Sequence, residues 1–166
     1  FAASLETLEK DFSIEMYGGL DMSSLVKLLE LPSDKALKGN TDFMATLLIP
    51  LEDPSLPIRL NVKTDMKGAA INLPEPFGKK ANVKENVEVN IIFADAMDLR
   101  VDMGELIRSH LELKKGSVVR GVLAIESDRL ELPGKGQILT VGHLKSFSLS
   151  QWNEAYPKIL NLSGER

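Results

Sequence analysis

Residues that could carry out chemistry are few in this sequence. The chain has two histidines, His110 and His143, and no cysteine, which excludes disulfides, thiol catalysis and cysteine metal ligands. Neither histidine has the spacing or the clustered carboxylates of a metal site. His110 falls between Arg108 and Glu112, on what the alternation indicates is the polar side of a strand. We interpret both histidines as surface residues and expect no metal and no cofactor.

Motifs for acyl transfer and phosphate binding are also missing. There is no GxSxG sequence, and Gly134-Lys135-Gly136 lacks the rest of a phosphate-binding loop. Acidic residues occur singly at alternating polar positions, as on a solvated sheet face. These are Asp65, Glu88, Asp98, Asp102 and Glu112. Because no catalytic constellation is present, we predict that the chain is not an enzyme.

Charge and hydropathy exclude two further classes of function. The 166-residue chain carries a net charge of −4, whereas nucleic-acid binding requires clustered Lys and Arg. The pairs Lys79-Lys80 and Lys114-Lys115 are interpreted as solubilising loop residues. The longest apolar run, 43–51, is too short to span a bilayer. We expect no nucleic-acid partner and no membrane anchor within these residues.

Alternation of apolar and polar residues is the strongest pattern in the chain. It runs without error through 57–67 and recurs at 43–49, 87–93 and 97–103. A period of two is typical of a strand with one apolar and one polar face. The sequence predicts a mainly β fold in a single domain, 1–166. Its long, twisted antiparallel sheet is expected to curl into a groove or half-barrel, with short helices at its ends.

Turn residues divide the chain into predicted strands joined by short connections, which indicates an antiparallel meander. Gly68 indicates a bulge or bend within the longest strand. The strands are expected at roughly 11–17, 37–51, 58–73, 83–93, 97–103, 106–113, 118–125 and 137–149.

Two helical segments are expected near the ends of the chain. Asp21 or Ser23 can cap the first, and Pro32 ends it. Its apolar face consists of Leu25, Leu28 and Leu29. Pro157 is predicted to break the second, at 150–162, into two short pieces.

The apolar face of the sheet has two interpretations. It can be an ordinary core, covered by the helices or a second sheet, or part of it can stay open as a hydrophobic groove. The predicted strands offer many more inward apolar side chains than two short helices can cover. The candidate groove residues are Ile58, Leu60, Val62, Met66, Val87, Val89, Ile91, Phe93, Leu99 and Val101.

Two stretches carry a resemblance to a known family. Residues 64–79 run from a strand into an LPxPxGK loop, and residues 132–144 continue to a conspicuous FSLSQW segment at 147–152. In this order they resemble the later, β-rich part of YhdP-like proteins of the AsmA superfamily, and the Lys38-Gly39 step into a long strand fits the same pattern. The resemblance covers roughly 19–152. The residues of the family-motif loop are Leu73, Pro74, Pro76, Gly78 and Lys79.

The resemblance implies a location and a function. Such proteins are large, are anchored in the inner membrane of Gram-negative bacteria by an N-terminal helix, and extend across the periplasm. Their stacked β-groove modules form one hydrophobic trough thought to carry phospholipid toward the outer membrane. The implied partners are phospholipid acyl chains and neighbouring modules of the same chain, with membrane contact through parts of the parent outside these residues.

Two other functions stay open at this stage. The module can be a closed structural scaffold for envelope assembly or stacking, without a ligand. A carbohydrate-binding β-sandwich is disfavoured because only 5% of the residues are aromatic. Since the chain begins at Phe1 and not at Met, we expect either a removed leader or a module excised from a longer envelope protein.

Overall fold

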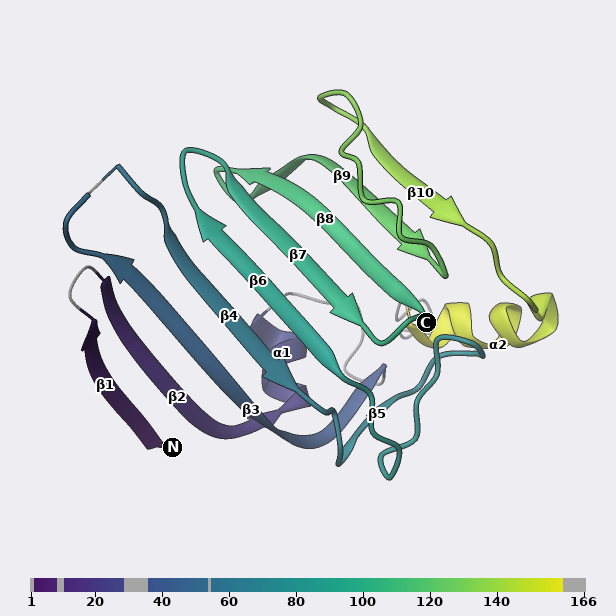
Figure 1. Ribbon diagram of the computed structural model, residues 1–166. Coiled ribbons are helices and arrows are strands. Elements are labelled where there is room, and N and C mark those ends of the chain that lie inside the picture. The colour runs from purple at the N-terminus through teal and green to yellow at the C-terminus, as the bar shows by residue number, and fades with distance from the viewer. Residues whose placement is uncertain (1, 9–10, 29–35, 54, 160–166) are drawn as a thin grey trace, which may run out of the picture. The chain divides into compact units, whose positions relative to one another are not determined.

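The protein is mainly β, as its sequence predicts. The computed structural model describes residues 2–8, 11–28, 36–53 and 55–159. Nine strands form one twisted sheet, in the order β1-β2-β3-β4-β6-β7-β8-β9-β10, and β5 pairs with β3 outside this path (Figure 1). The strands are β1 (Ala2–Leu8), β2 (Asp11–Asp21), β3 (Leu37–Pro50), β4 (Ile58–Thr64), β5 (Ala69–Ile71), β6 (Val87–Phe93), β7 (Met97–Met103), β8 (Ile107–Lys114), β9 (Ser117–Ile125) and β10 (Ile138–Gly142). The helices are α1 (Met22–Leu28) and α2 (Leu149–Ile159).

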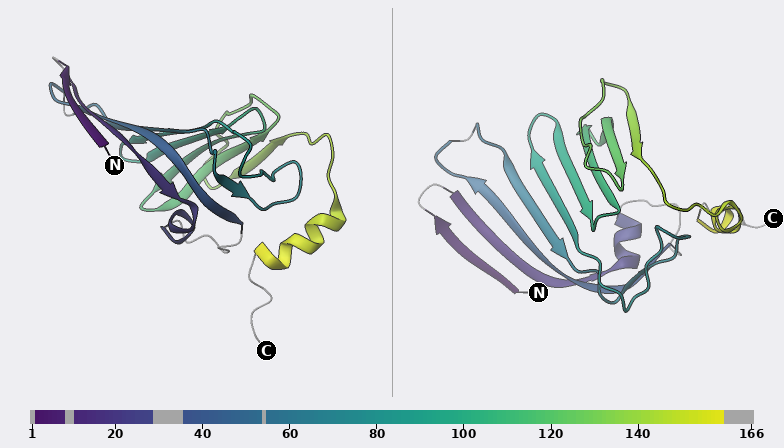
Figure 2. Two further views of the ribbon diagram at one scale, coloured as in Figure 1. Left: turned by 90° about the horizontal axis from the view of Figure 1, so that it is seen from below. Right: turned by 45° about the vertical axis from the view of Figure 1, so that its right-hand side comes forward.

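The chain divides into two compact units. We call the first the sheet unit; it consists of Phe1–Gly18, Phe43–Thr64 and Asn86–Leu144. The second, called the helix unit, consists of Gly19–Asp42, Asp65–Glu85 and Lys145–Arg166. The strands of the sheet unit lie side by side and are curved, as the views in Figure 2 show.

Strand register confirms the predicted alternation. Val62 lies opposite Ala45 on one side and Val89 on the other, and Val89 lies opposite Val101. Because side chains two residues apart share a face, the apolar positions of successive strands form continuous rows across the sheet. The polar positions form rows on the opposite face.

The final strand departs from the predicted meander. β10 pairs with β9 in parallel, with Ile138 opposite Gly121, whereas an antiparallel neighbour was expected. A parallel pair requires a crossover long enough to return the chain to the same end of the sheet, and residues 126–137 form that connection. β10 also ends at Gly142, earlier than the predicted boundary.

The strand expected at 58–73 is in fact two strands. β4 ends at Thr64, and β5 begins at Ala69. Between them Met66 has a φ of 51° and Gly68 a φ of 94°. A Cβ on Gly68 would lie 2.3 Å from the carbonyl oxygen of Asn40, so this reversal needs glycine both for its backbone angle and for space. Gly68 therefore marks the predicted bend, and it ends the alternation.

One strand was missed and another begins later than predicted. The missed strand is β1, which pairs along its whole length with β2. β6 begins at Val87, four residues after the predicted start, because the backbone before it forms turns, including the bond from Val83 N–H to the Lys80 carbonyl.

Helix α1 begins directly after a predicted capping residue. Asp21 caps α1: its carboxylate accepts bonds from the backbone N–H and the hydroxyl of Ser23, at 3.1 and 2.6 Å. The buried residues of α1 are Met22 and Val26. The predicted Leu25, Leu28 and Leu29 face and the stop at Pro32 lie outside the described residues or side chains.

The prediction that Pro157 breaks the second helix is wrong, since α2 continues through it. The ring stands in the last turn of α2, and both Pro157 and Asn153 are exposed. Water can therefore bind the Asn153 carbonyl that loses its intrahelical donor.

The family-motif loop, 73–79, belongs to the helix unit. A Cβ on Gly78 would lie 2.3 Å from the carbonyl oxygen of Leu73, so this position has room only for glycine. Immediately after it, Lys79 and Ile71 exchange two backbone hydrogen bonds of 2.8 and 2.9 Å. The ring of Phe77 meets Trp152 edge-on, with centroids 5.9 Å apart. The motif is thus a packing element of the helix unit.

Lys79 is the buried cation of this loop, although the sequence suggested a solubilising role. Its ammonium group donates to the carbonyl oxygens of Met66, Ala69 and Lys80, at 2.6, 2.7 and 3.2 Å. Burial lowers the pKa of the Lys79 amine, and the carboxylates of Glu85 and Asp65 act in the opposite direction. All three N–H bonds of the ammonium are used, so the side chain ties the turn at 66–69 to the end of the family-motif loop.

Replacing this cation tests its structural role. We expect Lys79→Met to lower the free energy of unfolding by about 2–3 kcal/mol, since it removes the ammonium donor from the Met66 and Ala69 carbonyls, of which the Met66 carbonyl keeps a bond from the Ala69 N–H. The matched change Lys80→Met alters an exposed residue and should shift stability by less than about 0.5 kcal/mol. Urea denaturation measures both, and equal midpoints would contradict this role.

Candidate functional site

Nine of the ten predicted groove residues lie on one face of the sheet unit. Leu60 of β4 faces Ile91 of β6, which in turn faces Leu99 of β7. The same register places the others in parallel rows. They are Ile58, Leu60 and Val62 on β4, Val87, Val89, Ile91 and Phe93 on β6, and Leu99 and Val101 on β7. We call this surface the apolar face.

Met66, the tenth predicted residue, does not belong to the apolar face. It lies beyond the end of β4, in the left-handed turn described above, and its side chain is buried within the helix unit. Its expected place rested on alternation through the whole of 57–67, which the backbone does not follow past Thr64.

Strand pairing extends the apolar face beyond the predicted set. Leu47 of β3 pairs with Leu60, and Leu111 of β8 pairs with Leu99. The side chain of Leu111 also occupies the space over Gly121, where a Cβ would lie 2.4 Å from its Cδ2 atom. The same period-two signal, continued into 43–49 and 107–113, could have added these residues.

Side chains of the apolar face are only partly covered. Ile58 and Phe93 retain 38% and 42% of their exposure, and the other seven predicted residues on this face are neither buried nor fully exposed. By contrast Val122 and Ala124, which β9 directs to the opposite face, are 0% exposed. On the apolar face, Ala45 is also buried, at 3% exposure, so the two faces differ mainly along β4, β6 and β7 on one side and β9 on the other.

The crossover at 126–137 explains this asymmetry. His110 on β8 directs Nδ1 toward the carbonyl oxygen of Leu130, at 3.3 Å, and Arg108 pairs with Asp128. Both contacts hold the crossover on the polar face. Val122 and Ala124 lie on this face, opposite His110 and Arg108 of β8. The sheet unit has no helix among its described residues, and its crossover covers the polar face.

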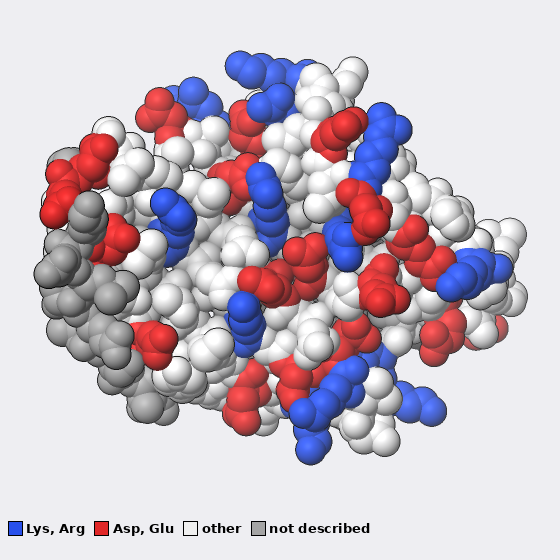
Figure 3. Space-filling model, in the orientation of Figure 1, with Lys and Arg blue, Asp and Glu red and all other residues white. Residues whose placement is uncertain are grey.

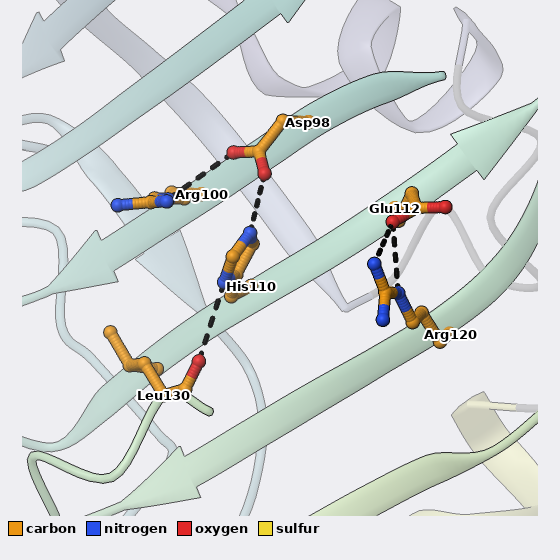
Figure 4. A network of polar contacts seen from close by, with 6 residues as sticks. All are labelled: Asp98, Arg100, His110, Glu112, Arg120 and Leu130. Carbon is orange, nitrogen blue, oxygen red and sulfur yellow. Dashed lines mark hydrogen bonds and ion pairs between the residues drawn. The ribbon is translucent and has the colours of Figure 1, made fainter. Parts of the chain in front are cut away.

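The polar face is a network of paired charges, many of them visible in Figure 3. Figure 4 shows two of its groups on neighbouring strands. His110 Nε2 lies 2.5 Å from a carboxylate oxygen of Asp98, whose other oxygen accepts a bond from Arg100 at 3.2 Å. Arg120 donates twice to Glu112, at 2.8 and 2.6 Å.

This network corrects two interpretations of the sequence. His110 is 8% exposed and bonded at both ring nitrogens, so it is not a surface histidine; His143 is exposed, as expected. The acidic residues are not singly solvated either. Asp65 pairs with Lys84, Asp102 with Arg108, and Glu88 with Lys63. Sequence spacing could not show the pairs because the partners are on different strands or distant loops.

Glu88 illustrates how the polar face is held together. Asn61 donates from Nδ2 to Glu88 at 2.6 Å and to Asn90 at 2.7 Å. The hydrogen bond from Asn61 is the main reason that the pKa of the Glu88 carboxyl is lowered, and Lys63 contributes to the same shift against the effect of burial. Polar cross-strand contacts thus stabilise β4 and β6 without contributing to the apolar face.

The chemistry of the described residues is limited to these contacts. Within 2–8, 11–28, 36–53 and 55–159, no group of three His, Cys, Asp or Glu side chains is placed to hold a metal ion. No helix in the same ranges is long and apolar enough to cross a membrane. The apolar face is the surface of the sheet unit that these contacts do not occupy.

A matched pair of valines tests the difference between the two faces. We expect Val122→Asp to prevent folding or to destabilise the protein by several kcal/mol, because the position is 0% exposed and the nearby Arg120 and His110 are already bonded to Glu112 and Asp98. Val62→Asp, on the partly exposed apolar face, should cost about 1 kcal/mol and leave the fold intact. Circular dichroism and urea denaturation measure both, and complete unfolding of the Val62 variant would show that the apolar face is closed.

The two histidines provide a second matched pair. We expect His110→Leu to release the crossover, since Asp98 and the Leu130 carbonyl both lose their partner, and to lower stability by about 1–3 kcal/mol. Trypsin should then cut faster at Arg129 and Lys135. His143→Leu, at an exposed side chain, should leave the cleavage rate unchanged. Identical cleavage of the two variants would contradict an anchoring role for His110.

Comparison with known proteins identifies the family. The family model described as "YhdP protein" matches residues 1–165. No curated protein and no solved structure matches the chain. The match over nearly the whole sequence shows that the chain belongs to the YhdP family of AsmA-like bacterial envelope proteins.

Proposed function

We propose that the apolar face binds phospholipid acyl chains, in one module of a longer protein that carries phospholipid across the periplasm from the inner to the outer membrane. The observation that supports this proposal is the asymmetric burial of the sheet unit. Its predicted aliphatic side chains keep part of their exposure, 38% and 42% at Ile58 and Phe93, whereas the opposite face holds Val122 and Ala124 at 0% exposure. A partly exposed face of this composition is suited to an apolar ligand.

The energetics of lipid transfer favour such a surface. Exposure of an acyl chain to water costs ~0.8 kcal/mol per methylene, or about 13 kcal/mol for roughly sixteen of them. The rows across β4, β6 and β7 offer Leu60, Ile91 and Leu99 side by side. A chain lying on them loses much of its contact with water, and it meets no charged group that would hold it at one point.

The parent protein is expected to continue the same arrangement. In this proposal, residues 1–166 form a single module, and neighbouring modules of the same chain extend the apolar face on either side. The parent is anchored in the inner membrane by a segment outside these residues. The module itself catalyses no reaction and requires no cofactor, since its task is to shield acyl chains from water.

Neighbouring isoleucines on β6 provide the test. Ile91 is on the apolar face, and Ile92 is on the polar face between Arg59 and Asp98. We expect protein purified gently from a Gram-negative host to carry phospholipid, detected by native mass spectrometry. Ile91→Asp should lose most of this lipid while remaining folded. Ile92→Asp, the same change one residue away, should retain it.

The alternative is a closed structural scaffold that binds no lipid. It would give protein free of lipid in the wild type and in both variants. It would also make Ile91→Asp unfold the domain, as expected for a charge placed in a closed core. Either result would contradict the lipid-binding proposal.

A further inference from the structure

One corner of the sheet unit combines unpaired positive charge with exposed apolar side chains. We call it the basic corner and define it by Lys114, Lys115, Lys135, Val118 and Ile138. The lysines are exposed, and among the described residues no carboxylate forms an ion pair with any of them. Val118 and Ile138 retain 42% and 69% of their exposure. The whole chain has a net charge of −4, so the cluster of positive charge at this corner is opposite in sign to the net charge of the protein.

Two tight turns bring the lysines together. Lys114 pairs with Ser117 across the β8–β9 hairpin, and Lys115 and Gly116 both have positive φ, of 52° and 78°. Just before β10, Gln137 donates its N–H to the carbonyl of Gly134, which places Lys135 at the apex of the second turn. Strand β9 and the crossover lie between these two turns in the sequence, so only the folded structure shows that the turns are neighbours.

The first residues of β9 connect the two turns. Gly136 donates its N–H to the carbonyl of Val119, at 2.8 Å, only two residues after Ser117. The β8–β9 turn and the start of β10 accordingly lie at the same end of the sheet (Figure 1). Nearby acidic side chains are already paired: Glu112 with Arg120 and Glu131 with Arg129.

The basic corner is continuous with the apolar face. Val118 pairs with Leu113, and Leu113 pairs with Met97 at the end of β7. Ile138 pairs with Gly121, in the same row as Leu111. Lys114 follows Leu113 on the polar side of β8, at the end of the β8–β9 hairpin. A ligand lying along these rows would therefore place its apolar part on the face and its end at the edge of the sheet where the two lysine-bearing turns lie.

We propose that the basic corner binds the phosphate of the phospholipid whose acyl chains lie on the apolar face. This inference rests on the proposed function and adds a position for the headgroup. Charge complementarity supports it, since lysine is a flexible point charge that suits phosphate and its stem can lie along an apolar surface while the ammonium stays in water. The exposed corner makes each contact weak, which allows the lipid to leave.

Two short-chain probes separate the headgroup from the acyl chains. Dihexanoyl phosphatidylglycerol, kept below its micelle-forming concentration, carries the phosphate; dihexanoylglycerol has the same chains without it. Titration calorimetry on the wild-type chain should show about tenfold tighter binding of the phospholipid, since three exposed charge pairs act together. The difference should shrink as ionic strength rises.

The matched variants each remove three positive charges. The corner variant is Lys114→Gln, Lys115→Asn and Lys135→Gln, with asparagine chosen because it tolerates the positive φ of Lys115. The control variant is Lys38→Gln, Lys67→Gln and Lys80→Gln, at exposed positions of the helix unit. The corner variant should bind both probes equally, and the control variant should keep the tenfold preference.

Four results would overturn the proposal. Equal binding of the two probes by the wild type would leave acyl-chain binding intact and exclude a headgroup site. Equal loss of the preference in both variants would assign it to net charge alone. Competition by inorganic phosphate as strong as by the phospholipid would make the corner a site for free phosphate. Failure of the wild type to bind either probe would refute the proposed function together with this inference.

Discussion

The crossover between β9 and β10 packs on the polar face of the sheet unit and not on its apolar face. A sheet with one apolar and one polar face normally buries the apolar one, yet here the connection is held against the polar rows. His110 and Arg108 supply its contacts, to Leu130 and Asp128. The parallel β9–β10 pair requires the chain to cross the sheet. Because this connection lies on the charged side, Val122 and Ala124 are buried there, while the predicted groove residues of β4, β6 and β7 keep part of their exposure.

Strand pairing gives the apolar face its continuity. The Leu60, Ile91 and Leu99 row consists of residues that lie opposite one another in register, and a slip of one residue in any strand would turn its polar side chains into that row. The cross-strand contacts on the other face oppose such a slip, since Asn61 bridges Glu88 and Asn90. The paired charges of one face thus help to fix the geometry of the other.

How much the sequence reveals depends on the range of the interactions involved. Alternation is local, so the strand faces of Val62, Val89 and Val101 could be predicted from it. The paths of Met66 and of the last strand could not, because they depend on a left-handed turn and on a crossover. His110 was missed for the same reason: its neighbours Asp98 and Leu130 lie 12 and 20 residues away in the chain. The LPxPxGK motif drew attention to Lys79, but the carbonyl groups that its ammonium binds are known only from the folded helix unit.

For the proposed transfer of lipid, a partly exposed aliphatic face is better suited than a closed pocket. A pocket that surrounded an acyl chain would recover most of the ~0.8 kcal/mol per methylene and would hold the lipid too tightly to pass it on. Partly exposed rows recover only a share of that free energy, and moving a chain from one row to the next exchanges one set of Val, Ile and Leu contacts for an equivalent set. Dispersion contacts have no preferred direction, so the barrier between adjacent positions is small. Uniform apolar composition of this face across β4, β6 and β7 is then the property that the proposed function requires, and a single strong anchoring group in the middle of the face would work against it.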